Sequence, residues 1–510
     1  MDSIIVLDFG SQYSHLICRR IREENVYCEL LPYDSPLAVI KKLNPKGIIL
    51  SGGPSSVYSK GSPKPDRAIF KSGVPILGIC YGHQLLVNEF DGKIKRASRR
   101  EYGYADLFID DTSDLFKGVG RKLKCWMSHA DAAEELPEGF RVIAHTESSS
   151  SAAIANKEEG FYGIQFHPEV THTEYGAKIL KNFSRHISKA RPEWNMKNFV
   201  NTSITEIKEN VKNEKVLCAV SGGVDSTSLA VLLDRAIKEN LTCIFVDNGL
   251  LRQGENVFVP ALLGKKLGVN LISLDRREQF LSRLRDIEDP EMKRRIVGEE
   301  FANVFLAFNK SHGPFQWLAQ GTLYPDVIES GVSKGPASII KTHHNVGGLP
   351  KWLNMKILEP FRSLYKDEVK KVASLLGVPG ELLRRHPFPG PGLAVRIIGK
   401  VTDEKITIAR HASSIVEEEL KLAGWYGRVW QAYAAVGEDR AVGVVGDKRL
   451  YGYIVTVKVV ESNDAMTADW SRLPHELLQI ISNRITNEVE GVTWVTYAIS
   501  SKPPATIEPQ

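Results

Sequence analysis

Three residues have the types and spacing of a nucleophilic hydrolase. Cys80 follows an apolar segment in PILGICYGHQ and lies between Gly78 and Gly82. This G-x-C-x-G arrangement is typical of a nucleophile elbow, a sharp turn that places the nucleophile at a helix N-terminus, where the helix dipole favours a thiolate. His167 and Glu169 in FYGIQFHPEV point to the same face if this segment is a strand. We predict that His167 takes the thiol proton and that Glu169 fixes the tautomer of His167.

A second motif has the composition of a phosphate-binding loop. The sequence VLCAVSGGVDSTS places it between an apolar segment and an expected helix, and its positions are Ser221, Gly222, Gly223, Val224, Asp225, Ser226 and Thr227. Glycines let the backbone approach an anion, and amides at a helix N-terminus bind it. The loop lacks the lysine with which Walker-type loops hold a transferred γ-phosphate. We therefore predict that it holds a phosphate group that departs or stays behind.

The elements that must position these residues alternate between β-rich and helical segments. Between residues 4 and 187 the β-rich segments are IIVLDF, YCELLPY, GIILSGGP, PILGIC and FYGIQFHPEV, and the pattern restarts at VLCAV after the linker KARPEWNMKNF. This alternation predicts two successive, mostly parallel α/β domains at residues 1–190 and 191–385. HPFPGPGL interrupts regular structure and marks a second boundary. For residues 386–510 we predict an α+β domain with an antiparallel sheet and helices on one face.

Length, composition and cysteine spacing exclude several classes of protein. The 510 residues carry a formal charge of +5, and no apolar run approaches the roughly 20 residues of a membrane-spanning helix. The basic residues are dispersed, which argues against nucleic acid as a partner. Six cysteines without a CxxC pair indicate neither a disulfide framework nor a zinc site. We expect a cytoplasmic protein without membrane partners, because no signal segment opens the chain.

Considered singly, each catalytic feature also has a structural explanation. A cysteine beside an apolar strand is commonly just buried, and a strand end can carry His-Pro with an exposed glutamate. Together, however, GICYGHQ, FHPE and the SGGP at 51–54 resemble the class I glutamine amidotransferase family over nearly all of residues 1–190. The resemblance implies that glutamine is hydrolysed through a cysteine thioester and that ammonia is released.

The same resemblance implies roles for further residues. The backbone amides of Gly53 and Tyr81 would form the oxyanion hole, in which pre-aimed donors stabilise the tetrahedral intermediate. The glutamine substrate would be held by Gln84, Ser128, His129 and Asp131. Ala130 stands where this family is expected to have a glycine.

The SGGVDS loop resembles that of the ATP pyrophosphatases, adenine-nucleotide α-hydrolase-like proteins that split ATP between its α and β phosphates. The resemblance implies that the loop holds the β and γ phosphates and that Mg²⁺ accompanies ATP. Val246 ends the next apolar segment, and its main chain is expected to contact adenine, because strand ends of open α/β sheets line nucleotide clefts. Lys366 is a further candidate for the pyrophosphate. His343 and His344 lack a third ligand at useful spacing, so we expect them in a lid over ATP.

Motifs along the whole chain indicate which acceptor receives the nitrogen. FVDNGLLR, LAQGTLYPDVIES, IKTHHNVGGLP, RHPFPGPGL, VVGDKR and SKPPATIE resemble the GMP synthetase family in this order. That resemblance implies the reaction ATP + XMP + glutamine + water → AMP + pyrophosphate + GMP + glutamate, in which the xanthine O2 is adenylated and ammonia displaces AMP. It implies XMP contacts at Arg294, Gln431, Asp447, Lys502 and Glu508. The tail departs from the family's IEWE, since Pro509 and Gln510 follow Glu508.

The C-terminal domain pairs two subunits in this family, so a homodimer is expected. The alternation of Tyr451, Tyr453, Val455, Val457 and Val459 fits an exposed interface strand, although it equally fits one face of an ordinary sheet.

Two other functions are compatible with the separate motifs. The chain could be another glutamine-fed ATP pyrophosphatase whose acceptor is not XMP, or a nucleotide sensor without catalysis. Intact Cys80, His167 and Glu169 argue against a sensor, and the tail sequence argues for XMP.

Overall fold

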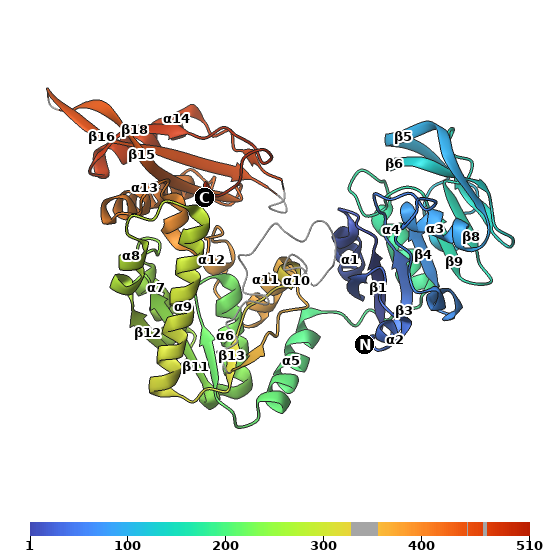
Figure 1. The fold of residues 1–510 in the computed structure, drawn as a ribbon, viewed down its shortest axis with the longest axis horizontal. Coiled ribbons are helices and arrows are strands. Elements are labelled where there is room, and N and C mark those ends of the chain that lie inside the picture. The colour runs from blue at the N-terminus through green and yellow to red at the C-terminus, as the bar shows by residue number, and fades with distance from the viewer. Residues whose placement is uncertain (328–354, 446, 463–466) are drawn as a thin grey trace. The chain divides into compact units, whose positions relative to one another are not determined.

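The computed structural model describes residues 1–327, 355–445, 447–462 and 467–510 (Figure 1). The expected lid residues His343 and His344 lie outside these ranges. The chain divides into two compact units, of which the first contains Met1–Phe199 and the second contains the described residues from Val200 onward. Within the described ranges, no helix has both the length and the apolar character needed to cross a membrane. The three domain boundaries expected from the sequence stay a prediction.

A nine-stranded sheet forms the centre of the first unit, in the order β2-β1-β3-β4-β9-β8-β7-β5-β6. Strands β2, β1, β3, β4 and β9 are parallel, whereas β5 to β8 pair antiparallel with one another and with β9. The strands β1, β3 and β4 are buried apolar runs, as expected where helices cover both faces. The bounds are β1 (Ser3–Asp8), β2 (Tyr27–Pro32), β3 (Pro45–Leu50), β4 (Ile76–Ile79), β5 (Lys93–Ile109), β6 (Lys122–Glu135), β7 (Arg141–His145), β8 (Ala153–Asn156) and β9 (Phe161–Ile164).

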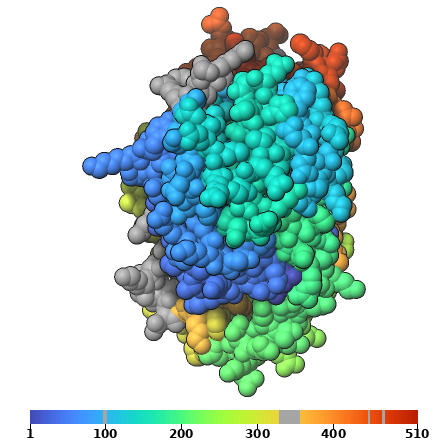
Figure 2. Space-filling view, turned by 90° about the vertical axis from the view of Figure 1, so that its right-hand side faces the viewer, coloured from blue at the N-terminus to red at the C-terminus, as the bar shows by residue number. Residues whose placement is uncertain are grey.

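Helices and short helical turns pack around this sheet. They are α1 (Ser14–Glu23), α2 (Leu37–Lys41), η1 (Arg67–Lys71), α3 (Tyr81–Glu89), η2 (Asp114–Phe116), α4 (Gly176–Lys181) and η3 (Asn182–Ile187). Helix α5 (Met196–Val211) begins in the first unit and lies mostly in the second. Ile5, Leu50 and Ile76 of the parallel strands pack with Leu85 and Leu86 of α3 in one buried core. Figure 2 shows the side chains of this unit, in blue and cyan, as a closely packed surface. The core fixes the carboxyl ends of β3 and β4, where the predicted glutaminase motifs begin.

Five parallel strands form the first sheet of the second unit, in the order β12-β11-β10-β13-β14. The strands are β10 (Val216–Ala219), β11 (Leu241–Asp247), β12 (Leu271–Asp275), β13 (Trp317–Ala319) and β14 (Lys356–Leu358). The helices and turns are α6 (Val224–Ile237), η4 (Lys238–Asn240), α7 (Glu255–Pro260), η5 (Ala261–Lys266), α8 (Arg277–Leu284), α9 (Pro290–His312), α10 (Tyr324–Val327), α11 (Lys366–Leu375) and α12 (Gly380–Leu383). The strand order reverses at β10, and open α/β sheets bind ligands in the crevice that such a reversal creates.

A second sheet follows, with β15 (Gln431–Val445), β16 (Lys448–Glu461), β17 (Asp469–Trp470) and β18 (Val492–Tyr497). The accompanying helical elements are η7 (Gly392–Arg396), α13 (Asp403–Leu422) and α14 (His475–Glu488), and residues of both α13 and α14 share one apolar core with this sheet. These observations confirm the predicted fold class. The sheet is not purely antiparallel as expected, because β18 pairs parallel with β16. This parallel pairing follows from α14, which carries the chain back along the sheet before β18 begins.

The alternating segment of β16 is exposed at one end and buried along the rest. Tyr451 is 64% exposed, whereas Tyr453, Val455, Val457 and Val459 are buried. Of the two alternatives that this alternation left open, the face of an ordinary sheet is confirmed from Tyr453 to Val459, because α13 and α14 cover this face, and the exposed strand is wrong except at Tyr451. The distal half of the β15–β16 hairpin extends past those helices (Figure 1).

HPFPGPGL packs against the loop that follows β11. Gly392 has a φ of +63°, and a Cβ there would lie 2.4 Å from the Leu250 carbonyl oxygen. The Leu393 N–H donates to that same carbonyl at 2.9 Å. Arg252 donates to the His386 carbonyl at 2.7 Å. The glycines and prolines of this segment therefore permit a close backbone contact within the second unit.

Candidate active site

Cys80 lies in a sharp turn between β4 and α3. Its φ of 51° is a strained value for a residue other than glycine, and its N–H donates to the Ile164 carbonyl at 2.8 Å. The flanking glycines have no room for a side chain. A Cβ on Gly78 would lie 2.3 Å from the Gly82 carbonyl oxygen, and a Cβ on Gly82 would lie 2.3 Å from that of Leu50. This elbow therefore requires both glycines.

His167 and Glu169 lie in the segment after β9, and not on the strand as the sequence predicted, because β9 ends earlier. The imidazole Nδ1 is 2.7 Å from Glu169 Oε1, and both side chains are buried. His167 also has a side-chain hydrogen bond with Cys80. Thr173 fixes the segment, because its Oγ1 donates to the His167 carbonyl at 2.6 Å and accepts from the Trp126 N–H at 3.0 Å. The structure thus brings the three triad candidates together.

Opposing effects set the charge of His167. Burial lowers the pKa of His167, but the Glu169 carboxylate and the hydrogen bond with Cys80 outweigh burial and raise the pKa to about 11. His167 is therefore an imidazolium at neutral pH. A neighbouring imidazolium favours the thiolate form of a cysteine, which is the nucleophilic form. The imidazolium proton is then available to a leaving amine.

The two amides expected to form the oxyanion hole come from different elements. Tyr81 directly follows the cysteine and is the first residue of α3, so its N–H has no acceptor within the helix. Gly53 belongs to the loop after β3, and a Cβ there would lie 2.6 Å from the Phe9 carbonyl oxygen. The preceding Gly52 lies against the triad, since a Cβ on it would stand 3.2 Å from His167 Cε1. The loop after β3 is therefore packed beside the His167 imidazole.

The main chain of β6 borders the thiol. The Ser128 carbonyl oxygen lies 3.7 Å from the sulfur, and Gln84 Nε2 donates to the Asp131 carbonyl at 3.1 Å. The Asp131 carboxylate accepts from Ser56 Oγ at 2.7 Å and from the Tyr58 hydroxyl at 2.6 Å. These contacts tie β6, α3 and the loop after β3 into one wall, which carries three of the four residues expected to hold glutamine.

The fourth of these residues, His129, turns its imidazole into the interior. Its Nε2 lies 2.9 Å from Glu101 Oε2, and its side chain is 2% exposed. Burial raises the pKa of Glu101, but hydrogen bonds from His129, Ser148 and Thr146 outweigh burial and lower it. The His129 side chain therefore supports β6 against β5, and its Nδ1 lies 3.1 Å from the Asp131 carbonyl oxygen, which also accepts from Gln84.

The SGGVDS loop follows β10 at the point where the strand order reverses. Gly222 has a φ of +77°, and a Cβ there would lie 2.4 Å from Val259 Cγ2. The Ser221 and Ser226 hydroxyl oxygens are 3.0 Å apart, and Ser226 Oγ donates to the Gly223 carbonyl at 3.3 Å. These bonds hold the loop at the N-terminus of α6, which is a favourable place for an anion.

Two buried polar atoms of this loop, Asp225 Oδ1 and Thr227 Oγ1, have no hydrogen-bond partner among the described residues. Buried polar groups normally have partners, so these atoms indicate where a ligand would bind. The other Asp225 oxygen accepts from Lys366 Nζ at the start of α11. Lys366, which lies 141 residues after Asp225 in the sequence, thus places beside the loop the positive charge that the loop itself lacks. Val246 is buried near the end of the neighbouring strand β11.

The C-terminal tail brings three expected XMP contacts close to one another. The Glu508 carboxylate accepts from Gln431 Nε2 at the start of β15. Arg294 on α9 donates from Nη2 to the main-chain carbonyl of Gln510 at 2.5 Å. The tail therefore connects α9 to β15.

The other two expected XMP contacts lie elsewhere. The main chain of Lys502 pairs with that of Ala468 through hydrogen bonds of 2.7 and 3.1 Å. Asp447 occupies the turn of the β15–β16 hairpin with a φ of 63°. Gln431 stands at the opposite end of this hairpin, paired with Val460, so at the usual rise of a strand the two residues are about 45 Å apart. Within one chain, the structure does not bring Asp447 to the tail.

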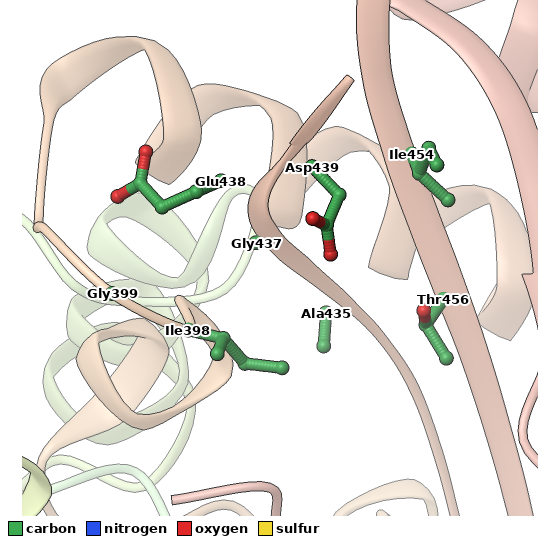
Figure 3. A pocket seen from close by; sticks show the side chains of 8 residues that line it. All are labelled: Ile398, Gly399, Ala435, Gly437, Glu438, Asp439, Ile454 and Thr456. Atoms are coloured by element: carbon green, nitrogen blue, oxygen red, sulfur yellow. The ribbon is translucent and has the colours of Figure 1, made fainter. Parts of the chain in front are cut away.

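A pocket of about 210 Å³ lies between β15, β16 and the segment that follows η7 (Figure 3). It is bordered by Ala435 and Thr456, which are cross-strand partners. Tyr433 lies two residues before Ala435 on β15, and its hydroxyl donates to the Ile507 carbonyl of the tail at 2.6 Å. Figure 3 shows Asp439 directed toward β16 and Glu438 pointing away from it. The Glu438 carboxylate is occupied by a lysine of α13.

Sequence reasoning missed residues that hold the site residues in place. Thr173 holds His167, Glu101 holds His129, and Arg396 donates to Glu508 at 3.0 and 3.2 Å. Thr173 lies only six residues from its partner, but Glu101 and Arg396 lie 28 and 112 residues from theirs. No local spacing identifies such pairs. For Arg396 the one available signal was its position three residues after the end of HPFPGPGL.

Residues 5–187 match the family described as glutamine amidotransferase class-I, and residues 418–509 match the GMP synthase C terminal domain. The chain is 52% identical over 507 residues to the glutamine-hydrolyzing GMP synthase of Caldanaerobacter subterraneus subsp. tengcongensis, with 99% of each chain covered. The chain belongs to the GMP synthase family. Similar relatives with the same name come from Aquifex aeolicus, 53% identical over 505 residues and 99% of each chain, and from Thermosipho africanus, 52% identical over 513 residues and 100% of each chain.

The GMP synthase family assignment covers both groups of candidate residues. Cys80, His167 and Glu169 fall within the amidotransferase match, and Gln431 and Glu508 fall within the C-terminal match. The phosphate loop lies between the two matches and is spanned by the full-length GMP synthase relatives.

Proposed function

We propose that the chain makes GMP from XMP by the reaction ATP + XMP + glutamine + water → AMP + pyrophosphate + GMP + glutamate. The observation that carries this proposal is the presence, in one member of the GMP synthase family, of a Cys-His-Glu triad and of a phosphate loop that lacks its own lysine. The first site would supply ammonia, and the second would activate the acceptor that ammonia attacks.

At the first site, the Cys80 thiolate attacks the side-chain amide carbon of glutamine. The N–H groups of Gly53 and Tyr81 stabilise the oxyanion, and the His167 imidazolium gives its proton to the departing ammonia. Neutral His167 then takes a proton from the attacking water, whose oxygen cleaves the thioester to glutamate and restores the Cys80 thiolate and the His167 imidazolium. The polar atoms of Gln84, Ser128, His129 and Asp131 would border the glutamine substrate, since β6 and α3 meet beside the sulfur.

At the second site, the xanthine O2 attacks the α-phosphorus of ATP, and the bond to the β-phosphate oxygen breaks. The β and γ phosphates would lie on the amides and hydroxyls of SGGVDS, with Lys366 Nζ neutralising part of the charge that develops on pyrophosphate. The main chain around Val246 would contact adenine at the end of β11. Ammonia then attacks C2 of the adenylated base and displaces AMP.

Mg²⁺ is proposed to arrive with ATP. In the described ranges, no group of three or more His, Cys, Asp or Glu side chains is arranged to hold a metal ion, so phosphate oxygens would have to supply ligands. The partnerless oxygen Asp225 Oδ1 is a carboxylate oxygen of the type that Mg²⁺ prefers. When bound, the ion would neutralise charge on the β and γ phosphates.

XMP would bind where the tail meets α9 and β15. Glu508 and Gln431 can accept from and donate to base or ribose groups, and Arg294 and Lys502 offer cations for the nucleotide phosphate. The support for this placement is that Arg294, Gln431 and Glu508 converge on one tail, which is the segment with the family's SKPPATIE sequence.

We propose a homodimer in which Asp447 serves the XMP site of the partner subunit. Because the hairpin places Asp447 far from Gln431 of its own chain, a contact with XMP requires a second copy. The hairpin around Asp447 also exposes Val442, Val444 and Tyr451 to 55, 72 and 64%. Exposed apolar patches of this kind mark interaction surfaces. We place the enzyme in the cytoplasm, where the six free cysteines would stay reduced.

The test is to offer the full chain ATP, Mg²⁺ and ammonium with XMP or with other acceptors, and to assay AMP and pyrophosphate. The proposal expects GMP, AMP and pyrophosphate in equal amounts with XMP alone. ADP and phosphate as products would contradict the assignment of the loop, and equal turnover of a different acceptor would contradict the assignment of XMP.

A further inference from the structure

Arg396 contacts the tail residue Glu508 from the interior of the fold. Arg396 Nε donates to Glu508 Oε2 at 3.2 Å, and Nη2 donates to Oε1 at 3.0 Å. The arginine side chain is 1% exposed, and that of Glu508 is 15% exposed. Paired hydrogen bonds between a guanidinium and a carboxylate fix the orientation of the carboxylate as well as its position.

Two aromatic rings hold the guanidinium of Arg396 in place. Its carbon lies 4.5 Å from the ring centroid of Tyr433 and 4.9 Å from that of Phe388. Tyr433 also holds the tail directly, because its hydroxyl donates to the Ile507 carbonyl at 2.6 Å. Phe388 belongs to the HPFPGPGL segment, which contacts the loop after β11 through Gly392 and Leu393. Contacts with Tyr433 and Phe388 therefore hold the Arg396 guanidinium in place independently of Glu508. The paired hydrogen bonds from this guanidinium then fix the Glu508 carboxylate.

Glu508 retains capacity for a further donor. Its Oε1 accepts from Arg396 and from Gln431 Nε2, whereas its Oε2 accepts only from Arg396 among the described side chains. A carboxylate has about four lone-pair positions. A hydroxyl or N–H group of a nucleotide can therefore donate to Glu508 without displacing Arg396.

We propose that Arg396 is a positioning residue for the XMP site, which orients the Glu508 carboxylate toward the nucleotide without touching the nucleotide itself. The inference rests on the proposed function, in which Glu508 contacts XMP. It predicts that loss of Arg396 weakens XMP binding through Glu508, while ATP binding and glutamine hydrolysis stay nearly unchanged.

The test uses the full chain with ammonium as nitrogen donor, so that the glutaminase does not limit the rate. In Arg396→Met, KM for XMP should rise about 10- to 100-fold, as expected when a binding group is misplaced, with KM for ATP within about twofold of the wild type. Arg396→Lys keeps the positive charge but loses the paired hydrogen bonds of the guanidinium. Its KM for XMP should lie between those of the wild type and Arg396→Met. Arg428→Met is the matched control, because Arg428 is exposed and stacks only on Trp425 among the described rings.

A double-variant comparison separates positioning from a general structural role. In a Glu508→Gln background, Arg396→Met should change KM for XMP by no more than about twofold, because the group through which it acts is already altered. Independent, additive effects would overturn the proposal. So would a similar rise in KM for XMP and ATP, or an unchanged KM for XMP in both Arg396 variants. If Arg396→Met does not fold, Arg396→Lys and its Glu508→Gln double variant decide by the same criteria. If the wild type does not convert XMP at all, the proposed function fails instead.

Discussion

The Gly82 Cα lies so close to the Leu50 carbonyl oxygen that a Cβ would stand 2.3 Å from it. Leu50 is the last residue of β3, and Gly82 belongs to the first turn of α3. The turn that carries Cys80 is therefore packed backbone against backbone on the strand whose following loop carries Gly53. The predicted nucleophile and the expected oxyanion donor therefore lie on segments that contact each other directly.

Gly82→Ala tests this contact. The added Cβ must displace β3 or the elbow, so glutamine hydrolysis should fall by about 100-fold, since a misplacement of about 1 Å costs that much. Overpacking should also lower the free energy of unfolding by about 1–3 kcal/mol. Glutamate release and denaturant unfolding are the measurements. Gly120→Ala is the control, because the Cβ has room there, with its closest contact at 3.7 Å. Wild-type hydrolysis in Gly82→Ala would contradict the required close approach.

Glu169→Gln tests the charge of His167. Burial lowers the pKa of His167, and without the carboxylate only Cys80 opposes burial, so the imidazolium fraction at neutral pH should fall. Alkylation of Cys80 by iodoacetamide at pH 7, followed site by site with mass spectrometry, should slow at least about tenfold. Glu193→Gln, an exposed change, should leave it unaltered. An alkylation profile that is identical in Glu169→Gln and wild type would show that Glu169 does not set the charge.

The same shift predicts the direction of a pH effect on stability. The pKa of His167 is raised from 6.5 to about 11 in the folded chain. Its contribution to the free energy of unfolding is therefore fully present below pH 6.5 and is lost as the pH rises toward 11. Between these pH values the wild type should lose more unfolding free energy than His167→Gln. Parallel pH profiles of the two proteins would contradict the raised pKa.

Lys366→Met tests the lysine beside the phosphate loop. With ammonium as donor, pyrophosphate release should fall about 10- to 100-fold, because a cation near the departing phosphates is removed. Glutamate release should be retained, since the triad lies in the other unit. Lys370→Met on the same helix is exposed and serves as the control. Equal activities of the two variants would remove Lys366 from the site.

Val444→Asp tests the proposed dimer. Val444 is 72% exposed near the tip of the hairpin, and a charge there should disrupt an apolar interface. Sedimentation velocity should show two 56.8 kDa chains in the wild type and one in the variant. Ile480→Asp, on α14, should remain dimeric. A monomeric wild type would contradict both the dimer and the role of Asp447.

Site residues that lie close together in the sequence, or within one regular element, could be predicted from the sequence. The elbow glycines beside Cys80 and the nearby pair His167 and Glu169 define local motifs, so their chemistry was visible before the fold was known. The alternation of apolar and helical segments similarly predicted the α/β class. The order of strands around β10 then placed SGGVDS at the reversal.

Contacts between side chains that lie far apart in the sequence could not be predicted from local patterns. Lys366 was nominated for the pyrophosphate through the family resemblance alone, and its contact with Asp225 spans 141 residues. The contact of Arg396 with Glu508 spans 112 residues and was not predicted. The separation of Asp447 from Gln431 likewise depends on the hairpin register, which no composition shows. The parallel pairing of β18 was missed for the same reason, because a strand's partner is chosen by the path of the chain and not by its own residues.

One chain is proposed to carry two sites, a thiol that makes ammonia and a nucleotide site that uses it. The most direct measurement is GMP formation by Cys80→Ala, with glutamine and with ammonium as alternative donors. With glutamine, GMP and glutamate should both disappear. With ammonium, GMP, AMP and pyrophosphate should form at nearly the wild-type rate. Parallel loss with both donors, in a variant that unfolds like the wild type, would contradict the division into two sites.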